Sequence, residues 1–152
     1  MKRSVVFMMI YYDRKPVTRM SFYHMRKVMD MYQEMGVECE AMVFGDEEDQ
    51  RELATALGFK HFDVPKNPFG RKFNLAIKTC CAAGKDFVCW LGSNNVHDYD
   101  YMRECAEIMQ QGKVSFGSKH FIICTDEHNR VKKFTCKERN VCSSGQFINT
   151  TS

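Results

Sequence analysis

The stretch Asp86–Tyr101 holds the densest group of side chains that could do chemistry. It begins with an unbroken apolar run, Phe87–Leu91, which is typical of a strand buried on both faces of a sheet. After Gly92 the chain becomes polar and presents, in order, Ser93, Asn94, Asn95, His97, Asp98 and Asp100. Because ligands bind beyond the carboxyl ends of the strands in open α/β sheets, we expect these side chains at a binding site.

These residue types suit acid–base chemistry and the binding of a cation. His97 is the best placed of the five histidines, and with its neighbour Asp98 it forms the candidate catalytic pair. Asp98 and Asp100 form a D-x-D pattern, which suits a hard divalent cation because such ions prefer carboxylate oxygens. The same two residues also fit the start of a helix, with Asp98 as its N-cap and Asp100 in its first turn.

The elements that must position these residues alternate between strand and helix up to about residue 111. Apolar runs predict strands at residues 4–12, 38–44, 61–64 and 87–91. Apolar positions spaced by three and four predict helices at about 18–35, 47–57, 71–83 and 98–111. This order predicts an α/β fold with a mostly parallel central sheet and helices on both faces.

The last forty residues or so differ in pattern. Residues 114–116, 121–125 and 131–135 are strand-like, and the last two flank the polar segment Asp126–Arg130, which predicts an antiparallel hairpin. The polar end from Cys142 to Asn149 shows little sign of a closing helix. We therefore expect a single domain, residues 1–152, with an antiparallel region toward its C-terminus.

Composition and charge exclude several classes of protein. Charged residues make up 27% and hydrophobic residues 44% of the chain, and a net charge of +3 does not indicate a general nucleic-acid binder. No apolar run approaches the ~20 residues of a membrane span, and the N-terminus does not resemble a signal peptide. Most of the eight cysteines lie in apolar stretches without metal-binding spacing, which predicts reduced thiols in a cytoplasmic protein.

Several familiar motifs are absent from the sequence. There is no G-x-G-x-x-G, no G-x-x-x-x-G-K-[ST] and no G-x-S-x-G. A dinucleotide fold of the usual kind, an NTPase phosphate loop and a hydrolase serine are therefore not indicated. The remaining polar groups follow the first, second and fourth predicted strands and precede the third predicted helix, so they meet at one edge of the sheet.

In order and spacing, these groups resemble the GT-A-type glycosyltransferases, a family of nucleotide-diphospho-sugar transferases. The matching segments are YYDR at residues 11–14, Asp46 after Gly45, GRKFN at residues 70–74 and LGSNN at residues 91–95. The last segment stands where the family carries an acidic motif such as LGSDD. The resemblance covers about residues 4–125.

The resemblance implies a GT-A-like domain that transfers a sugar from a nucleoside diphosphate sugar to a hydroxyl acceptor. The donor-binding residues that it implies are Tyr11, Asp13, Arg14, Asp46, Lys72, Asn74, Ser93, Asn94 and Asn95. Asp46 could instead cap the second helix. The chain is short for the family, so either the acceptor-binding half is minimal or truncated, or a homo-oligomer completes the site.

Asn94 and Asn95 depart from the family's pattern, because they bring carbonyl oxygens without charge to the place of its metal-binding aspartates. The family's Mn²⁺ or Mg²⁺ ion neutralises the donor diphosphate. One alternative is that Asp98 and Asp100 hold such an ion. A second is a metal-free site in which basic side chains counter the diphosphate; they are Arg14, Lys15, Arg71 and Lys72.

Two further alternatives belong to other classes. In the first, the domain is a catalytically degenerate module that binds a nucleotide or a partner protein without transfer. In the second, it is a nucleotidyltransferase, which shares the fold class. A nucleotidyltransferase should carry a glycine-rich, basic turn after its first strand, and YYDRKP at residues 11–16 contains no glycine.

Overall fold

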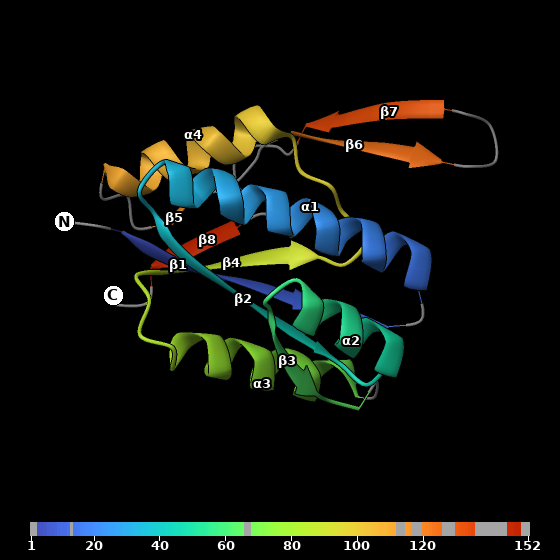
Figure 1. Ribbon diagram of the computed structural model, residues 1–152. Helices are drawn as coiled ribbons and strands as arrows, with labels where there is room; N and C mark the ends of the chain where they lie inside the picture. The colour runs from blue at the N-terminus through green and yellow to red at the C-terminus, as the bar shows by residue number, and fades with distance from the viewer. Residues whose placement is uncertain are drawn as a thin grey trace.

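In the computed structural model, the predicted alternation of strands and helices forms a central sheet covered by helices on both faces (Figure 1). The structure describes residues 3–12, 14–65, 68–111, 115–116, 120–125, 130–135 and 146–149, with side chains described up to residue 111. The predicted fold class, an α/β fold with a mostly parallel central sheet, is confirmed.

Four parallel strands form the part of the sheet that positions the candidate site. They are β1 (Ser4–Ile10), β2 (Glu38–Gly45), β3 (Lys60–Asp63) and β4 (Phe87–Gly92). Their order is β3-β2-β1-β4, so β1 lies between β2 and β4. Ile10, at the end of β1, is in register with Phe44 of β2 and with Gly92 of β4, so the three strands end at the same edge.

The helices divide between the two faces of the sheet. They are α1 (Lys15–Glu34), α2 (Glu48–Ala56), α3 (Phe69–Cys81) and α4 (Tyr99–Gln110). The helices α1, α2 and α4 cover one face and α3 covers the other, as Figure 1 shows. α1 begins at Lys15, earlier than predicted, because Pro16 in its first turn fits a position that needs no N–H. In the part of the chain that is described, no helix is both long and apolar enough to cross a bilayer.

β1 contributes side chains alternately to two hydrophobic cores. The side chains on the α1, α2 and α4 side are Val5, Phe7 and Met9, and those on the α3 side are Val6, Met8 and Ile10. All six are buried, which explains why the strand reads as an unbroken apolar run. Burying one such side chain contributes about 1.5–3 kcal/mol to the stability of the fold.

The C-terminal segments extend the sheet beyond β4. β8 (Gln146–Asn149) pairs antiparallel with β4, and β5 (Ser115–Phe116) pairs antiparallel with β8, which gives the six-stranded order β3-β2-β1-β4-β8-β5. The strand β8 was not predicted, because its four residues contain only two apolar positions. It protects an edge of β4 that would otherwise expose unpaired backbone groups.

A second, two-stranded sheet is formed by β6 (His120–Thr125) and β7 (Arg130–Thr135), which pair antiparallel. Both strands match segments that the sequence predicts to be strand-like. The residues 126–129 of the predicted hairpin loop lie outside the described residues, so the hairpin itself remains a prediction.

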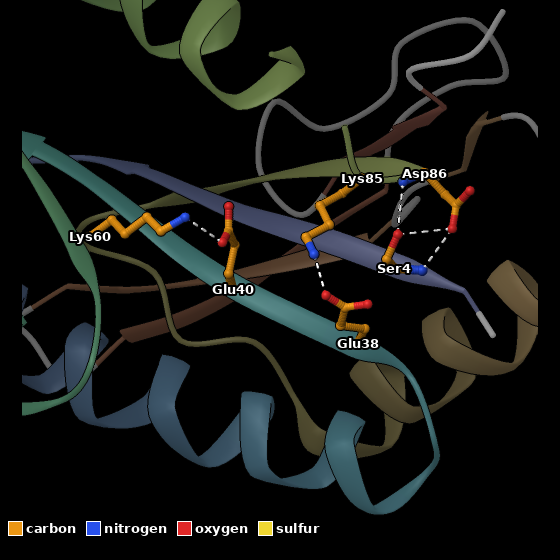
Figure 2. Close-up of polar contacts among 6 residues, drawn as sticks. All are labelled: Ser4, Glu38, Glu40, Lys60, Lys85 and Asp86. Atoms are coloured by element: carbon orange, nitrogen blue, oxygen red, sulfur yellow. Dashed lines mark hydrogen bonds and ion pairs between the residues drawn. The ribbon is translucent and has the colours of Figure 1, made fainter. Parts of the chain in front are cut away.

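At the amino ends of the strands, charged and polar side chains hold neighbouring segments together (Figure 2). Ser4 donates its N–H and its hydroxyl to the same carboxylate oxygen of Asp86, at 2.8 and 2.9 Å, and the Asp86 N–H donates to Ser4 Oγ at 3.0 Å. Two ion pairs join further segments: Lys60 with Glu40, and Lys85 with Glu38. The charged side chains in Figure 2 thus bind other parts of the same chain. The candidate site lies at the opposite edge of the sheet, where the strands have their carboxyl ends.

Candidate functional site

The tip of β1 and the first turn of α3 meet at the carboxyl edge of the sheet. The Lys72 ammonium, in the first turn of α3, donates a hydrogen bond to the Tyr11 carbonyl at 2.9 Å. Tyr11 also donates its N–H to the Phe44 carbonyl of β2 at 3.1 Å, which keeps the chain beside β2 after β1 ends. Two segments that the sequence assigned to one site, residues 11–14 and 70–74, are therefore in direct contact.

Lys72 is buried, with 1% of its surface exposed. Its ammonium lies 5.9 and 5.8 Å from the ring centroids of Tyr11 and Tyr12, a distance at which a cation is attracted to the ring face. Burial raises the pKa of Glu47 and lowers the pKa of His61, and the Lys72 charge makes a smaller, lowering contribution to both. The buried Lys72 ammonium thus places a positive charge next to the tip of β1. Direct contact between Lys72 and a donor remains a prediction.

Tyr11 is fully buried and packs as a core residue. Its ring meets Phe22 edge to face at 5.6 Å, and Gly45 lies so close that a Cβ there would be 2.2 Å from Tyr11 Cζ. Burial, with a smaller effect of Glu47, raises the pKa of Tyr11 far above its usual value, so the hydroxyl stays protonated at neutral pH. The aromatic ring that is exposed at the tip of β1 belongs to Tyr12, not to Tyr11.

His61 contacts Tyr11 of the candidate site, and the sequence did not single it out. Its Nε2 lies 2.6 Å from the Tyr11 hydroxyl, and its Nδ1 lies 3.7 Å from the Asp63 carboxylate. Burial lowers the pKa of His61, so at neutral pH its uncharged Nε2 can accept a hydrogen bond from the Tyr11 hydroxyl. No sequence motif indicates the contact between Tyr11 and His61. It arises because the short strand β3 pairs with β2, and this pairing is a property of the folded chain.

Besides Tyr11, the site residues predicted after β1 and β2 are Asp13, Arg14 and Asp46, and the structure describes two of these three. Asp46 is exposed immediately after β2. It is not the N-cap of α2, because that position is held by Glu47, which makes no side-chain capping bond, so the capping alternative for Asp46 is wrong. Arg14 is exposed and is the N-cap residue of α1, and Asp13 lies outside the described residues.

The loop after β4 folds back on itself and onto α1. The Asn95 N–H donates to the Gly92 carbonyl at 3.1 Å, which closes a turn, and Ser21 Oγ of α1 donates to the Asn95 carbonyl at 3.3 Å. Both carboxamides lie over Gly92: a Cβ on Gly92 would be 3.0 Å from Asn95 Nδ2 and 3.3 Å from Asn94 Oδ1. Asn94 is exposed, and Ser93 and Asn95 are half-buried, so the turn is accessible at the carboxyl edge.

His97 is bound to α1 through a second histidine. Its backbone N–H donates to His24 Nε2 at 3.3 Å, and its ring lies 6.2 Å from that of Tyr101. Burial, with a smaller contribution from His24, lowers the pKa of His97 to about 4. The imidazole is therefore neutral at pH 7 and can accept a proton or a hydrogen bond.

Asp98 and Asp100 form the start of α4. One Asp98 carboxylate oxygen accepts the N–H groups of Asp100 and Tyr101, at 2.9 and 3.1 Å, so Asp98 is the N-cap. Asp100 is exposed and pairs with Arg103 at 3.0 Å. The helix-start interpretation of these two residues is confirmed.

The described side chains at this edge show no cluster of ligands for a Mn²⁺ or Mg²⁺ ion. Asp98 already accepts two backbone N–H groups, and Asn94 and Asn95 supply no charge. Within the described ranges, no three His, Cys, Asp or Glu side chains lie close enough together to hold a metal ion. The metal role assigned to Asp98 and Asp100 therefore stays a prediction without a supporting contact.

The predicted site residues thus fall into three groups. The first group is the buried pair Lys72 and Tyr11, in which the Lys72 ammonium donates to the Tyr11 carbonyl. The second group has exposed or half-buried side chains: Arg14, Asp46, Arg71, Asn74, Ser93, Asn94 and Asn95. His97 and Asp98 connect this edge to α1 and α4.

Comparisons with known proteins support the fold. No family model and no curated protein matches the chain. The crystal structure of 4-diphosphocytidyl-2C-methyl-D-erythritol synthase matches with a TM-score of 0.59 and 8% identity, over 99% of this chain and 76% of that one. A Desulfovibrio desulfuricans G20 protein, provisionally described as a nucleotide-diphospho-sugar transferase, matches with a TM-score of 0.47 and 13% identity, over 76% of this chain and 57% of that one. At such identities the first match establishes a shared fold, and the second adds no argument.

Proposed function

We propose that this chain is a transferase that moves a sugar from a nucleoside diphosphate sugar to a hydroxyl acceptor. The observation that carries the proposal is the junction of α3 with β1, where Lys72 Nζ donates to the Tyr11 carbonyl at 2.9 Å. This contact brings a buried positive charge and a helix N-terminus to the carboxyl edge of a parallel sheet. Both attract anions, so the edge suits a diphosphate.

The exposed residues at the same edge supply the remaining contacts of the proposed donor site. Asp46 contacts the nucleoside, and Asn74 and the turn Ser93–Asn95 bind the ribose, the diphosphate and the sugar. Arg71 is exposed beside the buried Lys72, so its guanidinium can reach the diphosphate in a metal-free site. The name of the synthase with the shared fold contains a diphosphocytidyl group, which agrees with a nucleoside diphosphate ligand.

In this proposal the positive charges of Arg71 and Lys72 stabilise the departing diphosphate as its negative charge develops. His97 is the candidate proton acceptor for the acceptor hydroxyl, because a pKa of about 4 leaves its imidazole neutral at pH 7. Asp98, the N-cap of α4, is the second member of the proposed catalytic pair.

Donor binding tests the proposal directly. Uridine, guanosine and cytidine diphosphate sugars are titrated into the protein by isothermal calorimetry, with chelator and with Mn²⁺. We expect at least one donor to bind in the presence of chelator, and Arg71→Ala to weaken that binding about 10-fold, as expected for loss of a charged hydrogen bond. Lys27→Ala, an exposed basic residue of α1, is the control and should leave binding unchanged. No heat from any donor under either condition would rule out the transferase.

A catalytically inert nucleotide-binding module is the second candidate, and the two asparagines favour it. Asn94 and Asn95 bring no charge to the tip of β4, and their side chains lie back over Gly92. Prolonged incubation of the protein with a donor that binds separates the two candidates. Release of free nucleoside diphosphate, detected by mass spectrometry, supports the transferase, and an intact donor supports the inert module.

A further inference from the structure

Two buried polar side chains of α1 contact the backbone of the loop that follows β4. Ser21 Oγ donates to the Asn95 carbonyl at 3.3 Å, and the His97 N–H donates to His24 Nε2 at 3.3 Å. Ser21 is 1% exposed and His24 is 8% exposed. Because the two residues are three positions apart in the helix, they lie on the same face of α1 and contact the loop together.

Packing alone does not call for polar residues at these two positions of α1. Their sequence neighbours, Phe22 and Met25, are fully buried in the core between α1 and the sheet. A buried hydroxyl or imidazole lowers stability unless it is hydrogen-bonded, so an apolar side chain would serve the core better. The hydrogen bonds of Ser21 and His24 to the loop backbone therefore account for their polar atoms.

The His24 ring is held in the orientation that its contact needs. Its centroid lies 4.9 Å from that of Tyr99, the first residue of α4, and the two planes are inclined by 48°. Burial lowers the pKa of His24, so the ring is neutral at pH 7. A neutral ring that accepts the His97 N–H at Nε2 carries its own proton on Nδ1.

The turn after β4 is thus fixed at both of its ends. The Asn95 N–H donates to the Gly92 carbonyl at 3.1 Å, and the Asn95 carbonyl accepts from Ser21, so both backbone polar groups of Asn95 are paired. Ser93 and Asn94 lie between these two fixed points, with half-buried and exposed side chains respectively. The place of their polar atoms at the carboxyl edge therefore depends on α1 as well as on β4.

We propose that Ser21 and His24 are positioning residues, which hold the turn Ser93–Asn95 in the geometry that binds a nucleoside diphosphate sugar. The inference rests on the proposed function for the identity of the ligand. Both residues act through the loop backbone and not by contact with the donor. Without either bond the turn spends a smaller fraction of its time in the binding geometry, and the apparent affinity falls in proportion to that fraction.

Amide hydrogen exchange of the full chain without ligand, followed by two-dimensional NMR, tests the contact itself. The His97 amide should exchange about 10-fold faster in His24→Ala than in the native chain, as expected for loss of one hydrogen bond. His24→Gln should restore slow exchange, because its side-chain oxygen can accept the same N–H. Tyr32→Phe is the matched control: the Tyr32 hydroxyl donates from α1 to the Met102 carbonyl of α4 at 2.8 Å, eight positions farther along α1 than His24. This variant should leave the His97 amide unchanged.

Isothermal calorimetry with uridine, guanosine and cytidine diphosphate glucose measures the effect on affinity. We expect Ser21→Ala and His24→Ala each to weaken binding by about 2- to 10-fold, the range for loss of one neutral hydrogen bond. His24→Gln should bind like the native chain. Tyr32→Phe also loses a buried hydrogen bond from α1 and should lose thermal stability, but its affinity should not change. Thermal melts and far-ultraviolet circular dichroism confirm that each variant is folded.

The outcomes separate this inference from the proposed function. Unchanged exchange of the His97 amide in His24→Ala overturns the inference, and so does unchanged donor affinity in both alanine variants; the transferase stands in either case. Equal weakening by Tyr32→Phe also overturns it, because the effect would then be one of general stability. If the native chain binds none of the donors, the proposed function fails and the donor-binding role of Ser21 and His24 fails with it. Faster exchange in His24→Ala would then still show that α1 holds the turn.

Discussion

Gly45, at the end of β2, lies against the ring of Tyr11 at a distance that admits no side chain. A Cβ on Gly45 would be 2.2 Å from Tyr11 Cζ and 2.5 Å from both Cε atoms. The Tyr11 ring cannot turn away easily, because its hydroxyl bonds His61 and its edge packs on Phe22. We therefore expect Gly45→Ala to lower the free energy of unfolding by about 3 kcal/mol, at the upper end for overpacking. Urea denaturation measures this change.

Gly70, in the first turn of α3, provides the control for Gly45. Nothing lies within 4 Å of a Cβ built there. Because alanine favours a helix by about 1 kcal/mol over glycine, Gly70→Ala should be neutral or stabilising by up to that amount. Equal destabilisation of the two variants would contradict the close packing of Gly45 on Tyr11.

Gln50, in the first turn of α2, is a buried amide with unpaired polar atoms. It has 0% of its surface exposed, and neither its Nε2 nor its Oε1 has a hydrogen-bond partner within the described part of the chain. An unpaired buried polar group costs about 1–3 kcal/mol, so Gln50→Leu should raise the free energy of unfolding by about 1 kcal/mol. Urea denaturation measures the gain, and Gln33→Leu at an exposed position should change little. A loss of stability in Gln50→Leu would show that the amide is paired after all.

At the scale of the element, the start of α4 depends on Asp98. Its carboxylate accepts two backbone N–H groups of the first turn, so Asp98→Ala should cost about 1 kcal/mol. Asp98→Asn keeps a capping side chain and removes the charge, and it should therefore keep most of the stability. Asp100→Ala removes only an exposed pair with Arg103 and should cost about 0.5 kcal/mol or less.

The same three variants separate the capping role of Asp98 from a catalytic one. If Asp98 takes part in transfer, Asp98→Asn should be stable and have lost turnover, whereas Asp100→Ala should retain it. Full turnover in Asp98→Asn would leave Asp98 as a cap alone. The measurement is the rate at which nucleoside diphosphate is released from a donor that binds.

The helices and strands with strong apolar patterns could be predicted from the sequence. A strand that forms only through pairing with a segment distant in sequence could not. β1 and β4 are continuous apolar runs, and α1 and α4 carry apolar stripes, so the sequence predicts them to within a few residues. β8 has no such pattern, and it becomes a strand through its pairing with β4.

The candidate site divides in the same way. Its place at the carboxyl edge follows from the order of the elements, and Asp98 as a cap follows from local sequence. The burial of Tyr11 and Lys72 does not follow from the local sequence. It depends on the contact between α3 and the tip of β1, where the two residues are 61 positions apart in sequence. The pairing of Tyr11 with His61 likewise depends on β3 lying beside β2.

At the scale of the whole molecule, histidines kept neutral by burial link stability to pH. Burial lowers the pKa of His24, His61 and His97, in the last case to about 4. In the unfolded chain a histidine has a pKa of about 6.5, so below this pH the unfolded state binds protons that the folded state excludes. The contribution to stability is complete above pH 6.5 and is lost progressively as the pH falls toward the folded pKa.

The expected slope for His97 is a loss of about 1.4 kcal/mol in the free energy of unfolding per pH unit between pH 6.5 and about pH 4. Urea denaturation between pH 7 and pH 5, at constant ionic strength, measures it. His97→Gln removes the titrating ring and keeps the backbone N–H that donates to His24 Nε2, so its slope should be shallower. The carboxylates and His61 should contribute equally to both proteins, so the difference between the slopes reports His97 together with its coupling to His24. Parallel slopes would show that His97 titrates in the folded protein as it does in the unfolded chain.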